Sequence, residues 1–138
     1  MAAPTIASSA VVAGTNAVAS EANNIRTDAL TRYTRFLFEV KGALVVGNNQ
    51  GAEYVIPNAM TVRSIQYYID SGTSATFRIQ EDTTDVDSGI AATSTVSEDT
   101  SFANASLARL AKLSMDITAI SGSPVHLVII VECTETLS

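Results

Sequence analysis

From residue 36 onward, large apolar side chains recur at every second position, and this alternation limits what the chain can fold into. The clearest run is 75–80, where Ala75, Phe77 and Ile79 alternate with polar residues. A period of two puts successive side chains on opposite faces of a strand, so the pattern predicts strands buried on one face. Turn-forming residues separate the runs every ~8–15 positions, which is typical of an all-β sandwich or barrel. We therefore expect an all-β sandwich or barrel.

The expected strands are short and bounded by clusters of Gly, Pro, Asn and Ser. They cover 36–41 with a continuation at 44–46, then 54–56, 60–69, 75–80, 91–96, 113–117 and 125–133. Within the third of these we expect one face to carry Arg63, Ile65, Tyr67 and Ile69. Residues 81–89 are predicted to form an acidic loop. The path of residues 102–112 is left open, with one helical turn as an option.

The first 35 residues have a different composition and are expected to form a separate part of the chain. They are rich in Ala, Thr, Ser and Asn and carry almost no large apolar side chain before Ile25, so they cannot bury a core of their own. Ser20 is a suitable helix cap with Glu21 in the first turn, which predicts one short helix over 21–31. We expect an extended N-terminal arm with this helix at 1–35, followed by the sandwich at 36–138.

Two sets of apolar residues are candidates for binding partners. Ile25, Leu30 and Tyr33 offer a narrow apolar face in the arm. Val128 and Ile130 lie on the face of the last strand opposite its core residues, and a sandwich buries only one face of each strand. The second apolar face must be buried by another protein surface, so we expect the chain to bind copies of itself.

Composition narrows the classes of function. The chain has 8 basic and 14 acidic residues and a net charge of -6, which disfavours binding to nucleic acid. No stretch approaches the ~20 apolar residues of a membrane span. The first basic residue is Arg26, so no secretory signal is expected, and the chain is predicted to be made in a cytoplasm. Charged residues are only 16% of the chain, which favours a protein packed against other chains.

The sequence offers little for catalysis. His126 is the one histidine and lies within a predicted strand, where we expect a hydrogen-bonded surface or interface residue and no catalytic base. Cys133 is the one cysteine and is expected to be a small buried hydrophobic residue. We therefore predict no catalytic residue, no cofactor and no enzyme activity.

The acidic segment carries the one candidate for a cation. Its carboxylates are Glu81, Asp82, Asp85 and Asp87, and Ca²⁺ prefers such oxygen ligands. Their spacing does not match an EF-hand loop. We expect an exposed loop without a required metal, and a structural cation site is the alternative.

Several ordered stretches resemble jelly-roll domains of tailed-bacteriophage virion proteins. They are 38–47 (FEVKGALVVG), 54–62 (YVIPNAMTV), and the pair 113–117 and 125–129, while 13–28 resembles a segment common in phage fibre and decoration proteins. The family usually has an Ala-Gly-Asp turn before its penultimate strand, and here 107–112 stands in that place.

The resemblance implies a jelly-roll-like sandwich that forms a homotrimer in a virion. The leading expectation is a capsid decoration (cement) protein on the capsid surface, with the major capsid protein or another virion protein as partner. The alternative is a tail-fibre, collar or head-fibre adhesin module that binds host surface glycan. That alternative predicts exposed aromatic residues near a loop, and Tyr67 and Tyr68 are the one adjacent aromatic pair.

Overall fold

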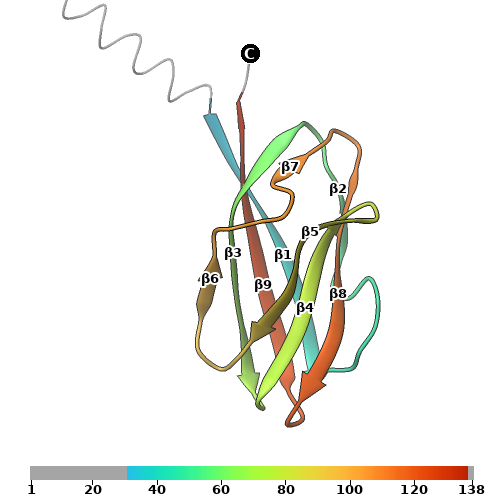
Figure 1. Ribbon diagram of the computed structural model, residues 1–138, viewed down its shortest axis with the longest axis vertical. Helices are drawn as coiled ribbons and strands as arrows, with labels where there is room; N and C mark the ends of the chain where they lie inside the picture. Colours follow the sequence, from blue (N-terminus) through green and yellow to red (C-terminus); the bar gives the residue numbers. More distant parts are fainter. Residues whose placement is uncertain (1–30, 137–138) are drawn as a thin grey trace, which may run out of the picture. The chain divides into compact units, whose positions relative to one another are not determined.

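The computed structural model describes residues 31–136, of which Tyr33–Glu135 form one compact unit built from β-strands (Figure 1). The strands are β1 (Thr31–Ala43), β2 (Glu53–Val55), β3 (Met60–Ser71), β4 (Ser74–Glu81), β5 (Thr84–Ala92), β6 (Ser97–Asp99), β7 (Ser106–Leu107), β8 (Lys112–Ser121) and β9 (Val125–Thr136). None of the described residues forms a helix that is long and apolar enough to cross a membrane.

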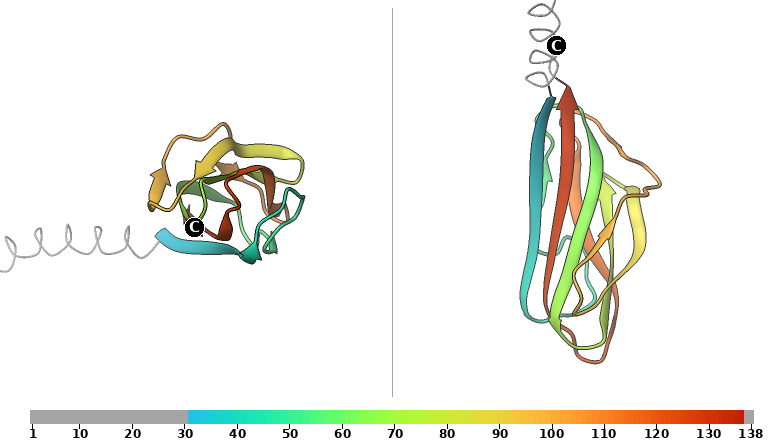
Figure 2. Two further views of the ribbon diagram at one scale, coloured as in Figure 1. Left: turned by 90° about the horizontal axis from the view of Figure 1, so that it is seen from below. Right: turned by 90° about the vertical axis from the view of Figure 1, so that its left-hand side faces the viewer.

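The strands form two antiparallel sheets that face each other as the layers of a sandwich (Figure 2). One sheet has the order β1-β9-β3-β6, with β7 also paired to β3, and the other has the order β2-β8-β4-β5. If the short β7 is set aside, the pairs are nested: the first strand pairs with the last, the second with the next to last, and β4 with β5. The all-β sandwich predicted from the alternation is confirmed.

The core lies between the sheets and is built from the inward-facing side chains of both. The largest fully buried side chains are Phe38, Ile56, Ile65, Ile69, Phe77, Ile79, Leu107, Leu113, Met115, Ile117, Leu127 and Ile129. Aromatic rings join the layers: Tyr67 of β3 meets Phe77 of β4 edge-on, with centroids 5.3 Å apart. The strict alternation of Ala75, Phe77 and Ile79, all buried, makes β4 the most accurately predicted strand.

A bulge in β3 corrects one predicted face. The pairing of β3 with β9 shifts between Val62 and Ser64, so one extra residue enters the strand there. Val62 and Ile65 are both buried as a result, whereas Arg63 is exposed. The prediction that Arg63 shares the face of Ile65 is therefore wrong, because a bulge reverses the alternation on one side of it.

The boundary predicted after residue 35 falls inside β1. This strand begins at Thr31 and lies beside the long strand β9, which continues to Thr136. Residues 33–35 therefore belong to the compact unit. The expected helix lies outside the described residues except for Thr31, which is in a strand, and the predicted continuation at 44–46 is not a strand.

The predicted acidic loop is a β-hairpin. β4 and β5 pair up to Glu81 and Thr84, and only Asp82 and Thr83 form the turn. β5 ends at Ala92, so the strand expected at 91–96 is wrong as well. Periodicity did not reveal β5 because polar residues occupy most of its first half.

The segment between β6 and β8 crosses one end of the sandwich without helical structure. It contains β7 and a turn at 109–110, and backbone hydrogen bonds tie it to both sheets. Val62 N donates to Ala105 O (2.7 Å), and Leu110 N donates to Ile56 O (2.7 Å). These bonds replace the helical turn that the sequence left as an option.

At the opposite end, two tight connections pass from one sheet to the other. One joins β3 to β4 through Gly72 (φ +101°), and the other joins β8 to β9 through Gly122 (φ +67°). A β-carbon on Gly72 would lie 2.8 Å from Pro124 N and closer still to its Cα. The two connections therefore pack directly against each other, and only glycine fits at this contact.

We expect Gly72→Ala to destabilise the sandwich far more than Gly89→Ala. Gly89 also has a positive φ (+66°), but its β-carbon would meet nothing within 4 Å. Backbone strain alone costs about 1 kcal/mol, and steric overlap adds ~1–3 kcal/mol. The midpoints of urea unfolding of both variants measure the difference, and equal losses would contradict the packing argument.

Candidate interaction surface

The outer face of the β1-β9-β3 sheet carries an apolar band, here called the outer stripe, made of Leu37, Tyr68, Val128 and Ile130. Val128 is paired across from Tyr68 and Ile130 across from Gln66, while their neighbours Leu127 and Ile129 point into the core. Leu37 is 45% exposed on β1 between the buried Phe36 and Phe38. The stripe therefore spans three adjacent strands on the side opposite the core.

Charged side chains border the outer stripe at both ends. Toward the chain termini, Arg35 on β1 forms an ion pair with Glu132 on β9 (Nη2 to Oε2, 2.9 Å), and Ser64 Oγ donates to Glu98 Oε2 at 2.6 Å. Toward the other end lie Glu39, His126 and Asp70. An apolar band with a polar rim is the usual layout of a protein interface.

His126 links three neighbouring strands at the second border. Its Nε2 lies 2.7 Å from Glu39 Oε2 on β1, and its Nδ1 lies 2.6 Å from Asp70 Oδ2 on β3. A neutral imidazole has only one N–H, so it can donate to only one of these carboxylates. The imidazolium donates to both, and its hydrogen bond to Glu39, followed by that to Asp70, raises the pKa of His126. We call this group the histidine clamp.

The backbone at His126 is unusual as well. Its φ is +58°, close to the start of β9, and Ser123 in the preceding turn has φ +52°. A non-glycine residue in this region costs ~1–2 kcal/mol, so other contacts must hold it there. The two carboxylates of the histidine clamp provide such contacts. His126 is thus the hydrogen-bonded surface histidine that the sequence predicted.

The predicted partner-binding residues are only partly brought together. Val128 and Ile130 lie in the outer stripe, as expected from their position opposite the core. Tyr33 is 69% exposed on β1, two strand positions beyond Arg35 along the same face. Ile25 and Leu30 lie outside the described residues.

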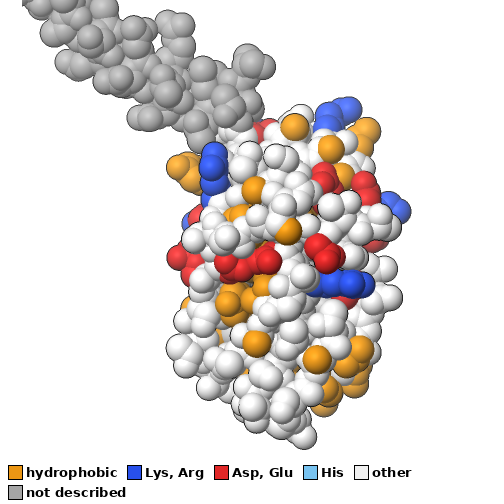
Figure 3. Space-filling model, viewed as in Figure 1, with side chains coloured by type: hydrophobic (Ala, Val, Ile, Leu, Met, Phe, Trp, Pro, Cys, Tyr) orange, Lys and Arg blue, Asp and Glu red, His pale blue; other side chains and the backbone are white. Residues whose placement is uncertain are grey.

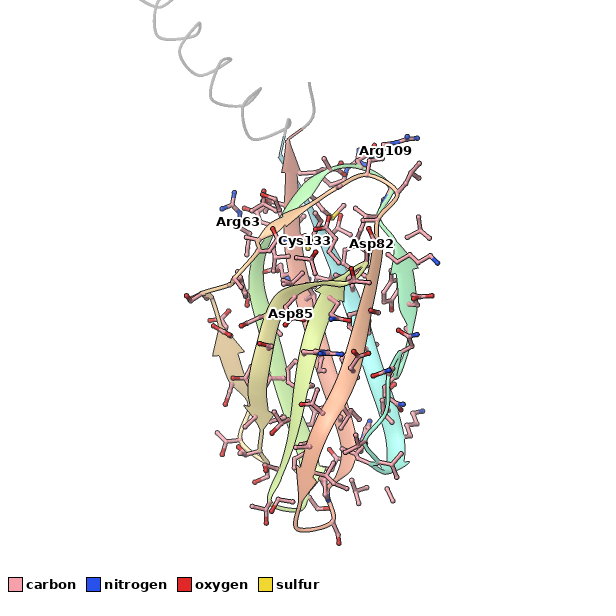
Figure 4. All side chains as sticks on the ribbon, turned by 45° about the vertical axis from the view of Figure 1, so that its right-hand side comes forward. Arg63, Asp82, Asp85, Arg109 and Cys133 are labelled. Atoms are coloured by element: carbon pink, nitrogen blue, oxygen red, sulfur yellow. The ribbon has the colours of Figure 1, made fainter. Side chains whose placement is uncertain are left out.

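The candidate cation residues are separated by the hairpin and bind protein groups instead. Glu81 accepts hydrogen bonds from Asn104 Nδ2 (2.9 Å) and from Ala108 N (2.5 Å). Asp82 Oδ1 accepts from Lys112 N (3.0 Å). Both carboxylates thus fasten the segment that crosses the end of the sandwich, and Figure 4 labels Asp82 at the turn, above Asp85 on β5.

Asp85 and Asp87 lie within β5 and also have separate surroundings. Asp85 Oδ1 accepts from Gln80 Nε2 (2.9 Å) on the paired strand. Burial and then a hydrogen bond with Asp99 of β6 raise the pKa of Asp87 to about 6, whereas the same hydrogen bond lowers the pKa of Asp99. Within residues 31–136, no three acidic, histidine or cysteine side chains are grouped so that they could hold one metal ion.

Cys133 lies in the core on β9, between the two sheets, as the sequence predicted (Figure 4). Burial raises the pKa of its thiol to about 12. The thiolate form that reacts as a nucleophile is therefore negligible near neutral pH.

Sequence reasoning missed the partners of His126 and two members of the outer stripe, Leu37 and Tyr68. Glu39 and Leu37 are ordinary outward positions of a predicted strand, so alternation alone shows only that they face away from the core, and Asp70 directly follows the predicted strand 60–69. Which outward residues meet depends on the pairing of β1 with β9 and of β9 with β3. A correct strand order would have brought all three beside Val128 and His126.

We expect His126→Gln to lower stability in a pH-dependent way. Because the pKa of His126 is raised in the folded protein, its contribution is complete below its unfolded pKa of about 6.5 and is lost as pH rises through the folded value. The melting temperature of the variant should fall below that of the unchanged protein at pH 6, and the gap should narrow as the pH rises through the folded pKa of His126. A gap that stays constant between pH 6 and 10 would show that His126 acts by packing alone.

We expect Asp87→Asn to stabilise the protein above pH 6. A carboxyl whose pKa is raised on folding costs stability once it ionises, so the cost grows between its unfolded value near 4 and about 6. An amide can instead donate to Asp99, and the gain should be about 1 kcal/mol for this partly exposed group. Urea unfolding at pH 4 and pH 8 measures it. Thr84→Asn, which introduces the same amide at an exposed position of the same strand without removing a carboxylate, is the control and should show no such pH-dependent gain.

Comparison with known proteins assigns no family to the chain. No protein-family model matches it, and no curated protein sequence matches it. The function proposed for it therefore rests on its own topology and surfaces.

Proposed function

We propose that this chain is a structural protein of a tailed-phage virion, with no enzymatic role. In this proposal it is a capsid decoration protein that forms a homotrimer, lies on the capsid surface and stabilises the head by bridging capsid subunits. The observation that carries the proposal is the outer stripe, an apolar surface on a sandwich that has already buried its core.

The strand order supports assigning the sandwich to the jelly rolls. A jelly roll arises when one long antiparallel hairpin, with its strands paired first to last, folds over into two sheets. The orders β1-β9-β3-β6 and β2-β8-β4-β5 follow that scheme once β7 is set aside. Jelly rolls are frequent in viral capsid proteins, but they also occur in lectins, so the fold alone does not decide the function.

The outer stripe supports self-association. Its residues lie on three adjacent strands, with Leu37 exposed and Tyr68, Val128 and Ile130 partly exposed, and burying apolar area is the main source of binding free energy in permanent oligomers. The charged borders fit the polar rim of such an interface. A trimer would link three weak attachments to the capsid, and linked attachments bind much more tightly together than each does alone.

The direction of β1 supports attachment through the N-terminal segment. β1 begins beside the end of β9, so the chain enters and leaves the sandwich at the same end (Figure 1). The opposite end is formed by the connections 71–74 and 121–125. In our proposal the segment before β1, with Ile25 and Leu30, binds the major capsid protein or another virion protein, and the sandwich projects from it.

The alternative of an adhesin that binds glycan through the tyrosine pair has less support. Tyr67 points into the core, where its ring packs on Phe77, and Tyr68 belongs to the outer stripe. The two rings therefore lie on opposite faces of β3. They do not form one exposed aromatic platform.

Light scattering of the purified full chain at micromolar concentration tests the self-association. We expect a mass of three times 14.5 kDa. Ile130→Glu puts a charge into the outer stripe and should give the monomer mass, because burying an unpaired carboxylate costs several kcal/mol. Thr118→Glu, at an exposed position of β8 in the other sheet, is the matched control and should leave the trimer intact.

A monomeric mass for the unchanged chain would overturn the proposal of a trimer. Mass spectrometry of purified virions then tests the location independently. Hundreds of copies per particle are expected for a decoration protein. A few to a dozen copies would place the chain in a tail or collar instead.

A further inference from the structure

The outer face of the second sheet carries a polar hollow of about 250 Å³. Its floor comes from Arg78 and Gln80 of β4 and from Asp116 of β8, and its wall from Asn48 and Asn49 of the loop between β1 and β2. Figure 3 shows this side of the molecule, where acidic and basic side chains lie across the middle of the face and the lower end is nearly free of charge. The hollow lies on the opposite side of the sandwich from the outer stripe.

The wall of the hollow is fixed by hydrogen bonds to β8. Gly47 and Ile117 exchange two backbone bonds of 2.9 and 3.0 Å, and Gln50 N donates to Met115 O at 2.7 Å. Asn49, with φ +53°, donates its backbone N–H to Asp116 Oδ1 at 2.9 Å. The hollow is therefore formed before any ligand arrives, which lowers the entropy cost of binding.

The floor contains an ion pair whose acidic member is almost fully buried. Asp116 faces outward on β8, yet its side chain is only 4% exposed, and its Oδ2 accepts from Arg78 Nε at 2.8 Å. Desolvating such a pair costs about as much as the attraction returns, so it is weak evidence for a stabilising role. What the pair does achieve is to hold a guanidinium, which has five N–H donors, in a fixed orientation at the floor of the hollow.

The lining indicates the kind of ligand. All of its side chains are polar, with amides at Asn48, Asn49 and Gln80 and a hydroxyl at Ser114, and no aromatic or large aliphatic group takes part. Such a lining suits a ligand with many hydroxyl groups, each of which both donates and accepts hydrogen bonds. The volume is below the ~300–1,000 Å³ of sites for drug-sized ligands, so a single sugar ring is a suitable size.

The charges in the lining point to a neutral ligand. Arg78 is neutralised by Asp116, and the remaining charged groups are Glu53, Asp82 and Lys112, which sum to a net negative charge. A phosphate or an acidic sugar would be repelled by such a site, whereas neutral hydroxyl groups can bind to groups of either sign.

We infer that this hollow is a binding site for a neutral saccharide, held by hydrogen bonds to the Arg78–Asp116 pair, Gln80 and the 48–49 wall. The site does not depend on the proposed trimer, and because it lies opposite the outer stripe it stays open when that stripe is covered. Without an aromatic stacking surface, we expect a dissociation constant on the order of 1–10 mM for a single sugar.

Amide NMR of the ¹⁵N-labelled full chain tests the site. The probes are glucose, galactose and N-acetylglucosamine, with N-acetylneuraminic acid as the acidic comparison. We expect saturable shifts at the amides of Asn49, Gln80 and Ser114 with at least one neutral sugar, and weaker or no binding of the acidic one. A host cell-wall polysaccharide made of the same sugar distinguishes a polymer ligand from a free sugar, since only a polymer ligand would bind more tightly than its monomer.

Arg78→Lys together with Asn48→Ala should weaken binding at least fivefold, because lysine keeps the charge next to Asp116 but lacks the planar array of donors. Thr118→Ala, outside the hollow on the same strand β8, is the control and should bind like the unchanged chain. Melting curves of both confirm folding.

The inference is overturned by an absence of saturable shifts up to 100 mM, by unchanged affinity in the double variant, or by tighter binding of the acidic sugar. Light scattering of the same samples reports the trimer separately.

Discussion

The pairing of the first strand with the last determines the rest of this sandwich. β1 can pair with β9 only after nearly the whole domain has been placed between them, and each inner pair is nested inside the outer one. Contacts of such long sequence separation fold slowly, because the entropy of closing large loops is lost before the contacts form. The same pairing brings Glu39, Leu37 and Arg35 beside His126, Val128, Ile130 and Glu132, so the outer stripe and the histidine clamp both depend on it.

Periodicity predicted those elements whose residues alternate strictly, and failed where the backbone departs from a regular strand. β4 was predicted almost to its ends because Ala75, Phe77 and Ile79 alternate with polar residues. The face of Arg63 was mispredicted, because a single extra residue at a bulge puts the alternation on its two sides out of phase without changing the composition. β5 was taken for a loop because its acidic residues mask a strand that is held by pairing with β4 and not by its own pattern.

The candidate site was less predictable than the fold, because it depends on strand order. Val128 and Ile130 could be identified from one strand, since their neighbours are continuously apolar. The histidine clamp could not, because Glu39 and Asp70 are 31 positions apart along the chain and both meet His126 only through β9. The carboxylates of the hairpin are close in sequence but do not form one site. Glu81 and Asp82 accept hydrogen bonds from the segment that crosses the end of the sandwich, whereas Asp87 is hydrogen-bonded to Asp99.

At three places next to the ends of strands, acidic side chains accept hydrogen bonds from backbone N–H groups. Asp116 holds the 48–49 loop, Glu81 holds the backbone at Ala108, and Asp82 holds that at Lys112. Bonds from backbone N–H groups to a carboxylate are stronger than those between neutral groups, so each acid can fix a segment that has few strand partners. The negative charge of the chain is therefore partly structural, since these carboxylates fix backbone segments at the edges of the sheets. In the proposed assembly the outer stripe of one sheet meets another protein, while the polar hollow on the other sheet stays in contact with water.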